Sequence, residues 1–392
     1  MKITSVETNL YTWKGPVKTD ETVFATPLSP LPFQDDTQKP FRFFSWLVVK
    51  ITTDEGIVGI GNAGLCPDIT QQIIDVKLKS LLIGENPLNT EYLFAKMFRS
   101  TVAYGRKGAV LAAISAVDIA LWDIKGHSTN QPVFMLMGGR TKEVIPAYYS
   151  RLYTRNLDKL QREAYSYKEQ GFKAMKLRCG YPLTDGLEGM RKNIEMVRTV
   201  RETVGEDVDI MLEAYMGFNF SYAKRLLKGL EPFNLRWVEE LLLPDEIHNF
   251  SKLKQYTDIP ISGGEHEFTR YGFHDLLQAD ALDIFQFDTN RVGGFTEAQK
   301  ICAMADVHGI EVIPHGGQMH NLHVVMSSFA CPMAEYFPKT EIEVGNELFW
   351  YIFDGEAVAD DGNLQLSDTK PGVGLTLKEI DLEKFPFQIT KK

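Results

Sequence analysis

From about residue 140 to residue 336, short strand-like runs alternate with stretches whose apolar residues recur at helical spacing. Eight strand-like runs follow one another at regular intervals, with a plausible helix after each. Eight strand–helix units in series predict a closed parallel barrel with its helices outside. An open, doubly wound sheet would usually have fewer strands, and no G-x-G-x-x-G motif follows the first run. The eight runs are VIPAYYS, KAMKLRC, DIMLEA, RWVEEL, PISGGE, DIFQFD, EVIPHG and MAEYF.

The chain is too long to consist of this barrel alone. Its 392 residues exceed one ordinary core, which predicts a second domain or a cap over the barrel. Up to about residue 125 the pattern is mixed: two strands are predicted within Phe44–Gly61, and helical stretches follow. The predicted division is a cap in residues 1–125, a barrel in residues 126–354, and a tail in residues 355–392 that returns to the cap.

Charge and composition exclude several classes of partner. The net charge of -10 argues against binding to nucleic acid or to an anionic membrane. The four cysteines are widely scattered, which is typical of a reducing compartment. No segment is long and apolar enough to span a bilayer, and the N-terminus lacks the apolar core of a signal peptide. We therefore expect a cytoplasmic protein that acts on a small molecule.

Three of the predicted strands end in a glutamate, at intervals of 26 residues. These are Glu213, Glu239 and Glu265. The carboxyl ends of barrel strands meet at one mouth, so these charges would lie close together and raise one another's pKa. A hard divalent cation such as Mg²⁺ would remove the repulsion and leave positions open for substrate. The alternative is that each glutamate pairs with an external Lys or Arg. Alternation allows only one of Glu239 and Glu240 to face the lumen, and it does not choose between them.

The sixth and seventh strands end in Asp288 and His315. A carboxylate beside an imidazole selects its tautomer and raises its basicity, so the pair predicts a proton-transfer dyad. The plain alternative is a histidine that caps a helix or is satisfied by the backbone. A zinc site formed by His315 with His320 and His323 is disfavoured, because the three glutamates already predict a hard-metal site.

Further charged residues end the second and the eighth strand. Lys176 and Arg178 alternate along the second strand, so both can face the lumen and hold an anionic substrate, or simply balance the glutamates. Arg178 is a poor proton acceptor, because a guanidinium stays charged. Glu335 could orient or protonate a substrate oxygen, or form an ordinary ion pair.

Taken together, these motifs resemble the enolase superfamily, mandelate racemase subgroup. The motifs that carry the resemblance are ISAVDIALWDIKG, KLRCG, MLEAY, NLRWVEE, SGGEH, QFDTNRVGG and IPHGG. The resemblance implies an α/β fold: a (β/α)8-type modified TIM barrel with an α+β N-terminal capping domain that the C-terminal tail completes. It also implies one Mg²⁺ per chain on Glu213, Glu239 and Glu265, catalytic roles for the Asp288–His315 dyad and Glu335, and a homo-oligomer.

Within that subgroup the chain is most similar to acid-sugar dehydratases of the rhamnonate dehydratase group, with ATPLS and SGGEH as supporting motifs. It departs from the usual pattern at two positions. Glu213 stands where the family usually has Asp, and Arg178 stands where the family has the second lysine of a K-x-K pair. A two-base racemase needs a proton acceptor on each face of the substrate. The departure at Arg178 therefore favours one-base chemistry on the His315 face.

The resemblance implies a Mg²⁺-dependent lyase. His315 would remove the C2 proton of an aldonic acid to give an enediolate, and loss of water would give a 2-keto-3-deoxy sugar acid. Two alternatives remain: a cycloisomerase that opens an anhydro-sugar acid by β-elimination, and a barrel that binds acid sugars without turnover. The long segment Lys14–Lys39 predicts a lid or binding loop, or a disordered stretch. Candidate substrate contacts are Arg42, Tyr104, Tyr149 and His266, although ordinary structural roles are the alternative for each.

Overall fold

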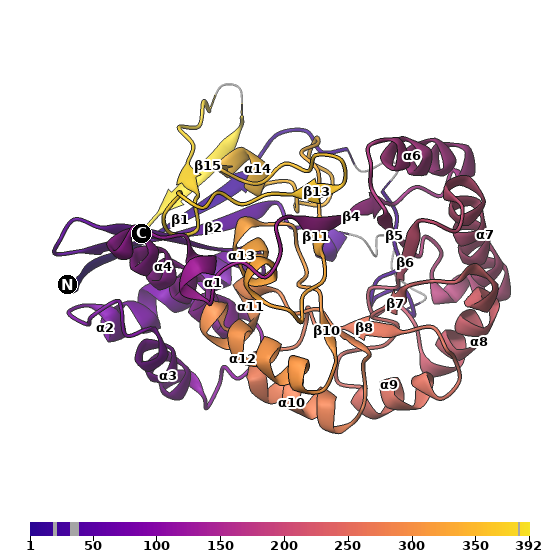
Figure 1. The fold of residues 1–392 in the computed structure, drawn as a ribbon, viewed down its shortest axis with the longest axis horizontal. Coiled ribbons are helices and arrows are strands. Elements are labelled where there is room, and N and C mark those ends of the chain that lie inside the picture. The colour runs from indigo at the N-terminus through magenta and orange to yellow at the C-terminus, as the bar shows by residue number, and fades with distance from the viewer. Residues whose placement is uncertain (19–21, 32–38, 383–384) are drawn as a thin grey trace.

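The computed structural model describes residues 1–18, 22–31, 39–382 and 385–392. Eight parallel strands curl into a barrel in the hydrogen-bonded order β10-β9-β8-β7-β6-β5-β4-β11 (Figure 1). All eight coincide with the strand-like runs of the sequence, so the predicted barrel is confirmed. The strands are β4 (Ile145–Leu152), β5 (Ala174–Arg178), β6 (Asp209–Glu213), β7 (Trp237–Glu239), β8 (Ile261–Gly263), β9 (Ile284–Phe285), β10 (Glu311–Val312) and β11 (Ala334–Tyr336).

Helices follow the strands and form the outer layer, which Figure 1 shows as an arc from α6 to α10. Each of these helices presents an apolar face to the sheet, and asparagine side chains start two of them. Asn156 accepts a hydrogen bond from the Lys159 amide, and Asn219 does so from the Tyr222 amide. The helices are α6 (Leu157–Glu169), α7 (Gly186–Val204), α8 (Phe220–Leu230), α9 (Ile247–Lys254), α10 (Thr269–Gln278), α11 (Thr289–Val292), α12 (Gly294–Val307), α13 (Met319–Ser327) and α14 (Phe349–Ile352).

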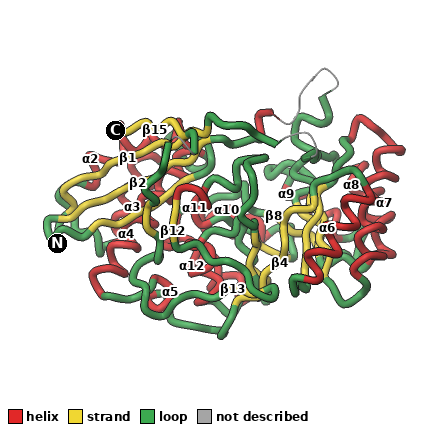
Figure 2. Tube along the Cα trace, turned by 90° about the horizontal axis from the view of Figure 1, so that it is seen from above, coloured by secondary structure: helices red, strands yellow, loops and turns green. Residues whose placement is uncertain are grey.

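The cap is built on an antiparallel sheet in the order β15-β1-β2-β3 (Figures 1 and 2). Its last strand comes from the C-terminus, where Ile389 pairs with Tyr11, so the predicted return of the tail is confirmed. The predicted boundary at residue 125 falls within α4, and its position stays a prediction. The cap elements are β1 (Ile3–Trp13), β2 (Ser45–Thr53), β3 (Val58–Ala63), β15 (Phe387–Lys391), α1 (Pro67–Ile73), a π-helical turn (Ile74–Leu78), α2 (Lys79–Leu82), α3 (Thr90–Thr101), α4 (Ala109–Thr129) and α5 (Val133–Leu136).

Helix α4 lies between the cap sheet and the barrel and is buried along almost its whole length. Gly59 and Gly61 of β3 let the sheet approach it closely, because a Cβ there would lie 2.1 Å from the Ala120 carbonyl oxygen and 1.8 Å from that of Ala116. On the barrel side, Asp118 accepts hydrogen bonds from the amide and hydroxyl of one threonine in α12, at 3.0 and 2.6 Å. The cap is therefore fastened to the barrel by both packing and polar contacts.

Loops of the cap reach the mouth of the barrel. The Ala25 amide, in the ATPLS stretch, donates to the Cys179 carbonyl directly after β5, at 2.7 Å. The part of Lys14–Lys39 in residues 19–21 and 32–38 lies outside the described residues, so the structure does not test the lid expected there. Among the described residues, no helix combines the length and the apolar character needed to cross a bilayer.

Candidate active site

Neighbouring parallel strands bring distant residues to one end of the barrel. In the sheet register Arg178 lies opposite Glu213, and Glu213 lies opposite Glu239. Each of these is the last residue of its strand, so all three side chains reach the same mouth. The convergence predicted from the strand ends is therefore present.

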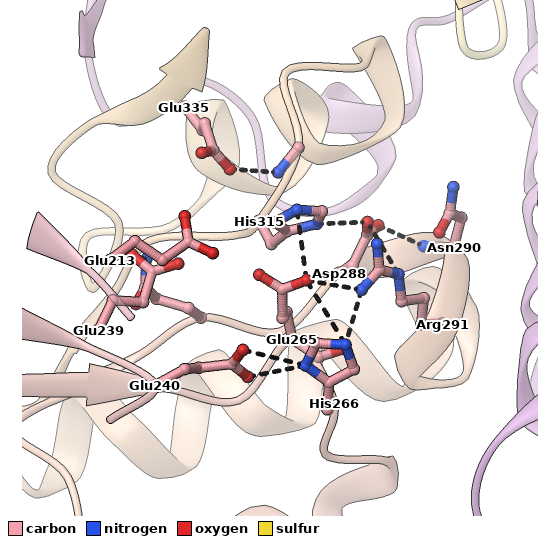
Figure 3. Close-up of polar contacts among 12 residues, drawn as sticks. Glu213, Glu239, Glu240, Glu265, His266, Asp288, Asn290, Arg291, His315 and Glu335 are labelled. Atoms are coloured by element: carbon pink, nitrogen blue, oxygen red, sulfur yellow. Dashed lines mark hydrogen bonds and ion pairs between the residues drawn. The ribbon is translucent and has the colours of Figure 1, made fainter. Parts of the chain in front are cut away.

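Glu213, Glu239 and Glu265 form a buried cluster in which one oxygen from each carboxylate lies within 4.8 Å of the other two (Figure 3). Their exposed fractions are only 1%, 1% and 3%. Burial raises the pKa of Glu213, and it raises that of Glu239 to about 7. Oε2 of Glu265 is buried without a hydrogen-bond partner among the described residues. A hard cation would satisfy this oxygen and offset the crowded charge, so the donor set fits Mg²⁺.

One ammonium group lies among the carboxylates. Nζ of Lys176 is 2.8 Å from Glu239, 3.0 Å from Glu335 and 3.2 Å from Glu213. Burial alone would lower the pKa of Lys176, but these carboxylates outweigh burial and hold it well above its ordinary value. Lys176 is therefore a positive charge held among the three carboxylates.

Arg178 is held in place by both charge and aromatic rings. Its guanidinium pairs with Glu213 and lies 5.3 to 5.6 Å from the ring centres of Phe24, Tyr153 and Tyr215. Cation–π contacts of this kind orient a guanidinium and reduce its mobility. The geometry places a permanent cation on the wall of the cleft, where an anionic substrate would lie.

Asp288 and His315 form the predicted contact on the other side of the cluster, with Nδ1 of His315 2.9 Å from Oδ2 of Asp288 (Figure 3). Nε2 of His315 lies 3.5 Å from Glu265. Burial alone would lower the pKa of His315, but Glu265 and Asp288 together raise it to about 9. Glu335 lies behind the dyad and accepts a hydrogen bond of 2.7 Å from the Gly316 amide.

Glu239 and Glu240 are both buried, although alternation allows only one of them to face the lumen. Glu240 has a φ of 44°, and this left-handed backbone turns its carboxylate away from Glu239. There it contacts Nδ1 of His266 at 2.8 Å, which raises the pKa of His266 against the lowering effect of burial. Glu239 points into the lumen, where it contacts Lys176 and lies beside Glu213 and Glu265. The structure thus gives the two glutamates separate partners.

Three of the candidate substrate contacts do not face the cleft. Tyr149 points out of the barrel and stacks on Tyr167 with ring centres 3.4 Å apart, whereas its neighbour Tyr148 faces the lumen over Lys176. Tyr104 is 61% exposed and is not among the residues that line the cleft. The Arg42 guanidinium donates to the backbone carbonyls of Thr22 and Glu343 and so braces two loops.

Arg291 belongs to the site, although no role was predicted for it from the sequence. Its Nη1 lies 2.9 Å from Glu265, its Nε lies 3.5 Å from Asp288, and it lines the cleft beside His315. The available signal was its place in QFDTNRVGG, three residues after Asp288 and so on the same side of a helical turn. The described cleft also has an aromatic and apolar wall, formed by Phe24, Phe41, Phe43, Tyr153, Tyr215 and Val344.

Comparisons with known proteins agree with this arrangement. Residues 159–381 match the family model "Enolase C-terminal domain-like", and residues 23–138 match "Mandelate racemase / muconate lactonizing enzyme, N-terminal domain". An L-rhamnonate dehydratase from Saccharopolyspora erythraea is 34% identical over 92% of this chain and 91% of its own.

Two solved structures are also similar over nearly the whole chain. Rhamnonate dehydratase from Gibberella zeae complexed with Mg has a TM-score of 0.83 and 31% identity, over 96% of this chain and 94% of its own. The 3,6-anhydro-D-galactonate cycloisomerase from Zobellia galactanivorans has a TM-score of 0.80 and 29% identity, over 98% of this chain and 99% of its own.

Proposed function

The chain belongs to the mandelate racemase/muconate lactonizing enzyme family of the enolase superfamily, and from that premise we propose that it dehydrates an aldonic acid. The observation that carries the proposal is the pairing of His315 with Asp288 beside a buried carboxylate triad. A base and an anion-stabilising centre on one cleft are what removal of a proton next to a carboxylate requires.

Glu213, Glu239 and Glu265 would hold one Mg²⁺. When bound there, the ion supplies electrostatic stabilisation of the negative charge that develops on the substrate carboxylate. Lys176 and Arg178 lie beside the triad at the end of β5, and their positive charges would bind and orient the same carboxylate. These residues together align C2 of the substrate with the base.

Nε2 of His315 would accept the C2 proton, because Asp288 holds the other ring nitrogen as the donor. Glu265 raises the pKa of His315 in this structure. When Glu265 ligates a cation its pull on the imidazole weakens, so the base becomes available nearer neutral pH. The protonated His315 can then deliver the proton to the departing C3 hydroxyl.

Arg178 favours elimination over racemisation. It lines the same cleft as His315, and a guanidinium cannot accept a proton near neutral pH. A racemase would need a second base there. The described lining of the cleft offers only His315 in that role, which favours one-base elimination.

The described lining of the cleft favours a monoacid. Phe24, Phe41, Phe43 and Val344 give the cleft an apolar wall, and its two arginines, Arg178 and Arg291, are each paired with a carboxylate of the site. Relatives act on L-rhamnonate, a monocarboxylate whose other end is a methyl group. We therefore propose L-rhamnonate or a closely related aldonate as the substrate.

A specific observation also supports cycloisomerisation. The cycloisomerase from Zobellia galactanivorans has the same fold at 29% identity, and opening an anhydro ring begins with the same proton removal. In that reaction the ether oxygen leaves instead of water. A barrel that only binds acid sugars is the remaining alternative, but pure binding would not need the oriented Asp288–His315 pair.

The test is a panel of acids incubated with the enzyme and Mg²⁺ and scored for keto-acid product. The panel holds L-rhamnonate, L-mannonate, D-galactarate and 3,6-anhydro-D-galactonate. Turnover of the two aldonates above the diacid supports the dehydratase. Turnover of the anhydro acid alone would establish the cycloisomerase instead, and saturable binding without any product would establish a binding protein.

A further inference from the structure

We propose that His320 and Asn62 are positioning residues that hold Asp288, and through it His315, so that docking of the cap sheet completes the proton-abstracting pair. The inference rests on the proposed function, because it takes His315 as the base. It concerns two residues that do not touch the cleft and whose arrangement is set by contacts across the junction of cap and barrel.

The two carboxylate oxygens of Asp288 contact different groups. Oδ2 contacts Nδ1 of His315 at 2.9 Å, on the side of the cleft. Oδ1 faces away from the cleft, where it accepts a hydrogen bond of 3.0 Å from the Asn290 amide and lies 3.4 Å from Nδ2 of Asn321. Whatever contacts Oδ1 therefore sets the tilt of the carboxylate that orients the base.

His320 belongs to this rear group. Its side chain is fully buried in α13, and its Nε2 lies 3.6 Å from Oδ1 of Asp288. That nitrogen has no hydrogen-bond partner among the described residues, which is unfavourable for a buried polar atom. A movement of a few tenths of an ångström would close the contact, and catalytic hydrogen bonds commonly tighten when substrate binds.

Asn62 selects the tautomer of His320 that can make this contact. Its Nδ2 lies 3.5 Å from Nδ1 of His320, and its Oδ1 lies 3.4 Å from Nδ2 of Asn290, which acts as the donor. An amide donor beside Nδ1 makes that nitrogen the acceptor and leaves the proton on Nε2, pointing at Asp288. Nδ1 of His315 then donates to Asp288, and Nε2 of His315 stays free to accept a proton.

The chain of contacts crosses from one part of the molecule to another. Asn62 lies on β3 of the cap sheet, is 3% exposed, and sits one residue beyond Gly61, where the sheet touches α4. Asn290, His320 and Asp288 belong to the barrel. Asn62 can make these contacts only when the cap sheet is packed against the barrel, so the orientation of His315 depends on that packing.

His323, in the same helix as His320, is a structural histidine and serves as a comparison. His323 is 2% exposed and has partners for both nitrogens: Nδ1 accepts from the Phe134 amide at 3.1 Å, and Nε2 donates to the Val373 carbonyl at 3.0 Å. Burial lowers the pKa of His323 to about 4. His320 differs from it by having an unpaired nitrogen directed at the carboxylate of the dyad.

The test compares His320→Leu, His320→Gln and Asn62→Ala with the matched control His323→Gln, using L-rhamnonate and Mg²⁺. Loss of an outer partner that orients a metal-ligating histidine typically lowers activity by about 10 to 100-fold, and we apply the same range to a partner that orients the base. We expect His320→Leu to lower kcat in that range while KM changes by less than about threefold. His320→Gln keeps a donor toward Asp288 and should recover most of kcat. The control should lower the melting temperature and leave kcat within about twofold of wild type.

A second readout does not depend on turnover. Nitrogen-15 chemical shifts of the eight histidines, assigned by substitution, report which ring nitrogen carries the proton. At about pH 10, where His315 is mostly neutral because its pKa is about 9, we expect this histidine to be protonated on Nδ1 in wild type. In His320→Leu and Asn62→Ala we expect a mixed tautomer. Unchanged tautomers, or equal kcat in His320→Leu and wild type, would overturn the inference. If wild type turns over none of the panel, the proposed function fails, while the tautomer measurement still decides the positioning role.

Discussion

Glu213 contacts both cations at the end of β5. Its carboxylate contacts Arg178 through one oxygen and lies 3.2 Å from Lys176 through the other. An aspartate at this position would end about 1.5 Å further back along the side chain. The longer side chain therefore matches a site in which an arginine, held by aromatic rings, replaces the shorter lysine.

Shortening this side chain should separate metal binding from the rest of the site. We expect Glu213→Asp to weaken Mg²⁺ binding by about 10-fold or more, because the withdrawn carboxylate no longer reaches the other two ligands. Isothermal titration with MgCl₂ measures the change. The matched control is Glu297→Gln, which removes a buried carboxylate paired with Arg270 outside the cluster. Equal affinity in Glu213→Asp and wild type would show that the extra length of Glu213 is not needed to hold the ion.

Replacing the base should abolish chemistry and spare the cation. His315→Asn removes the proton acceptor but keeps a polar group next to Asp288, so we expect kcat to fall by at least about 10³-fold. Mg²⁺ affinity should stay within a few fold of wild type, because Asn does not alter the three carboxylates. Both quantities are measured on the same preparation. A variant that retained more than about a tenth of the activity would contradict the assignment of His315.

The sequence could predict the charged residues at strand ends but not every contact around them. Glu213, Glu239 and Glu265 were predictable because parallel strands deliver their last side chains to one mouth. Tyr149 was expected to contact substrate and instead packs outside the barrel. Both faces of a parallel strand are apolar, so the pattern of β4 does not show which face is inside. Arg291 lies in a four-residue helix for which the sequence holds no periodic signal.

Among the secondary-structure elements, α4 joins the cap to the barrel through the buried carboxylate of Asp118. Burial raises the pKa of Asp118 to about 7, against the lowering effect of the hydrogen bonds from Thr296. The folded protein therefore keeps this proton up to about pH 7, whereas the unfolded chain loses it near pH 4. Between these values the unfolded state binds fewer protons, so rising pH lowers the free energy of unfolding.

Asp118→Asn should remove this dependence on pH. In the structure both the amide and the hydroxyl of Thr296 donate to the Asp118 carboxylate. When Asp118 is protonated, its hydroxyl can donate to the Thr296 hydroxyl oxygen instead, and the amide of Asn presents the same pattern of one acceptor and one donor. Between pH 5 and 7 we expect wild type to lose about 2 kcal/mol of unfolding free energy relative to the variant. Urea denaturation at four pH values measures the difference. Parallel curves for the two proteins would contradict the raised pKa.

The elements themselves were predictable to different degrees. All eight barrel strands followed from short apolar runs with polar last residues. The separation of Glu239 from Glu240 did not follow, because a φ of 44° at Glu240 overrides the alternation of a regular strand. The apolar wall of the cleft comes from loops without any period, and only tertiary contacts place these loops.

At the scale of the whole molecule, the site is assembled from parts that are far apart in the chain. The C-terminal strand β15 completes the cap sheet (Figure 2), a cap loop contacts the barrel mouth at Cys179, and the strand ends supply the charges. A cation held by three strands would therefore add free energy to the folded state alone, because the unfolded chain has no such cluster.

Mg²⁺ should accordingly stabilise the entire protein. At a concentration about 100-fold above Kd, binding to the folded state alone adds about 2.7 kcal/mol. For a chain of 392 residues this corresponds to a rise in Tm of about 3 °C, since the entropy of unfolding is about 2.1 cal/mol/K per residue. Scanning calorimetry with MgCl₂ or with EDTA measures the shift. We expect Glu265→Gln to lose it and Glu297→Gln to keep it, because only Glu265 belongs to the triad. An equal shift in both variants would place the stabilising ion elsewhere, and the proposed mechanism would then lose its metal centre.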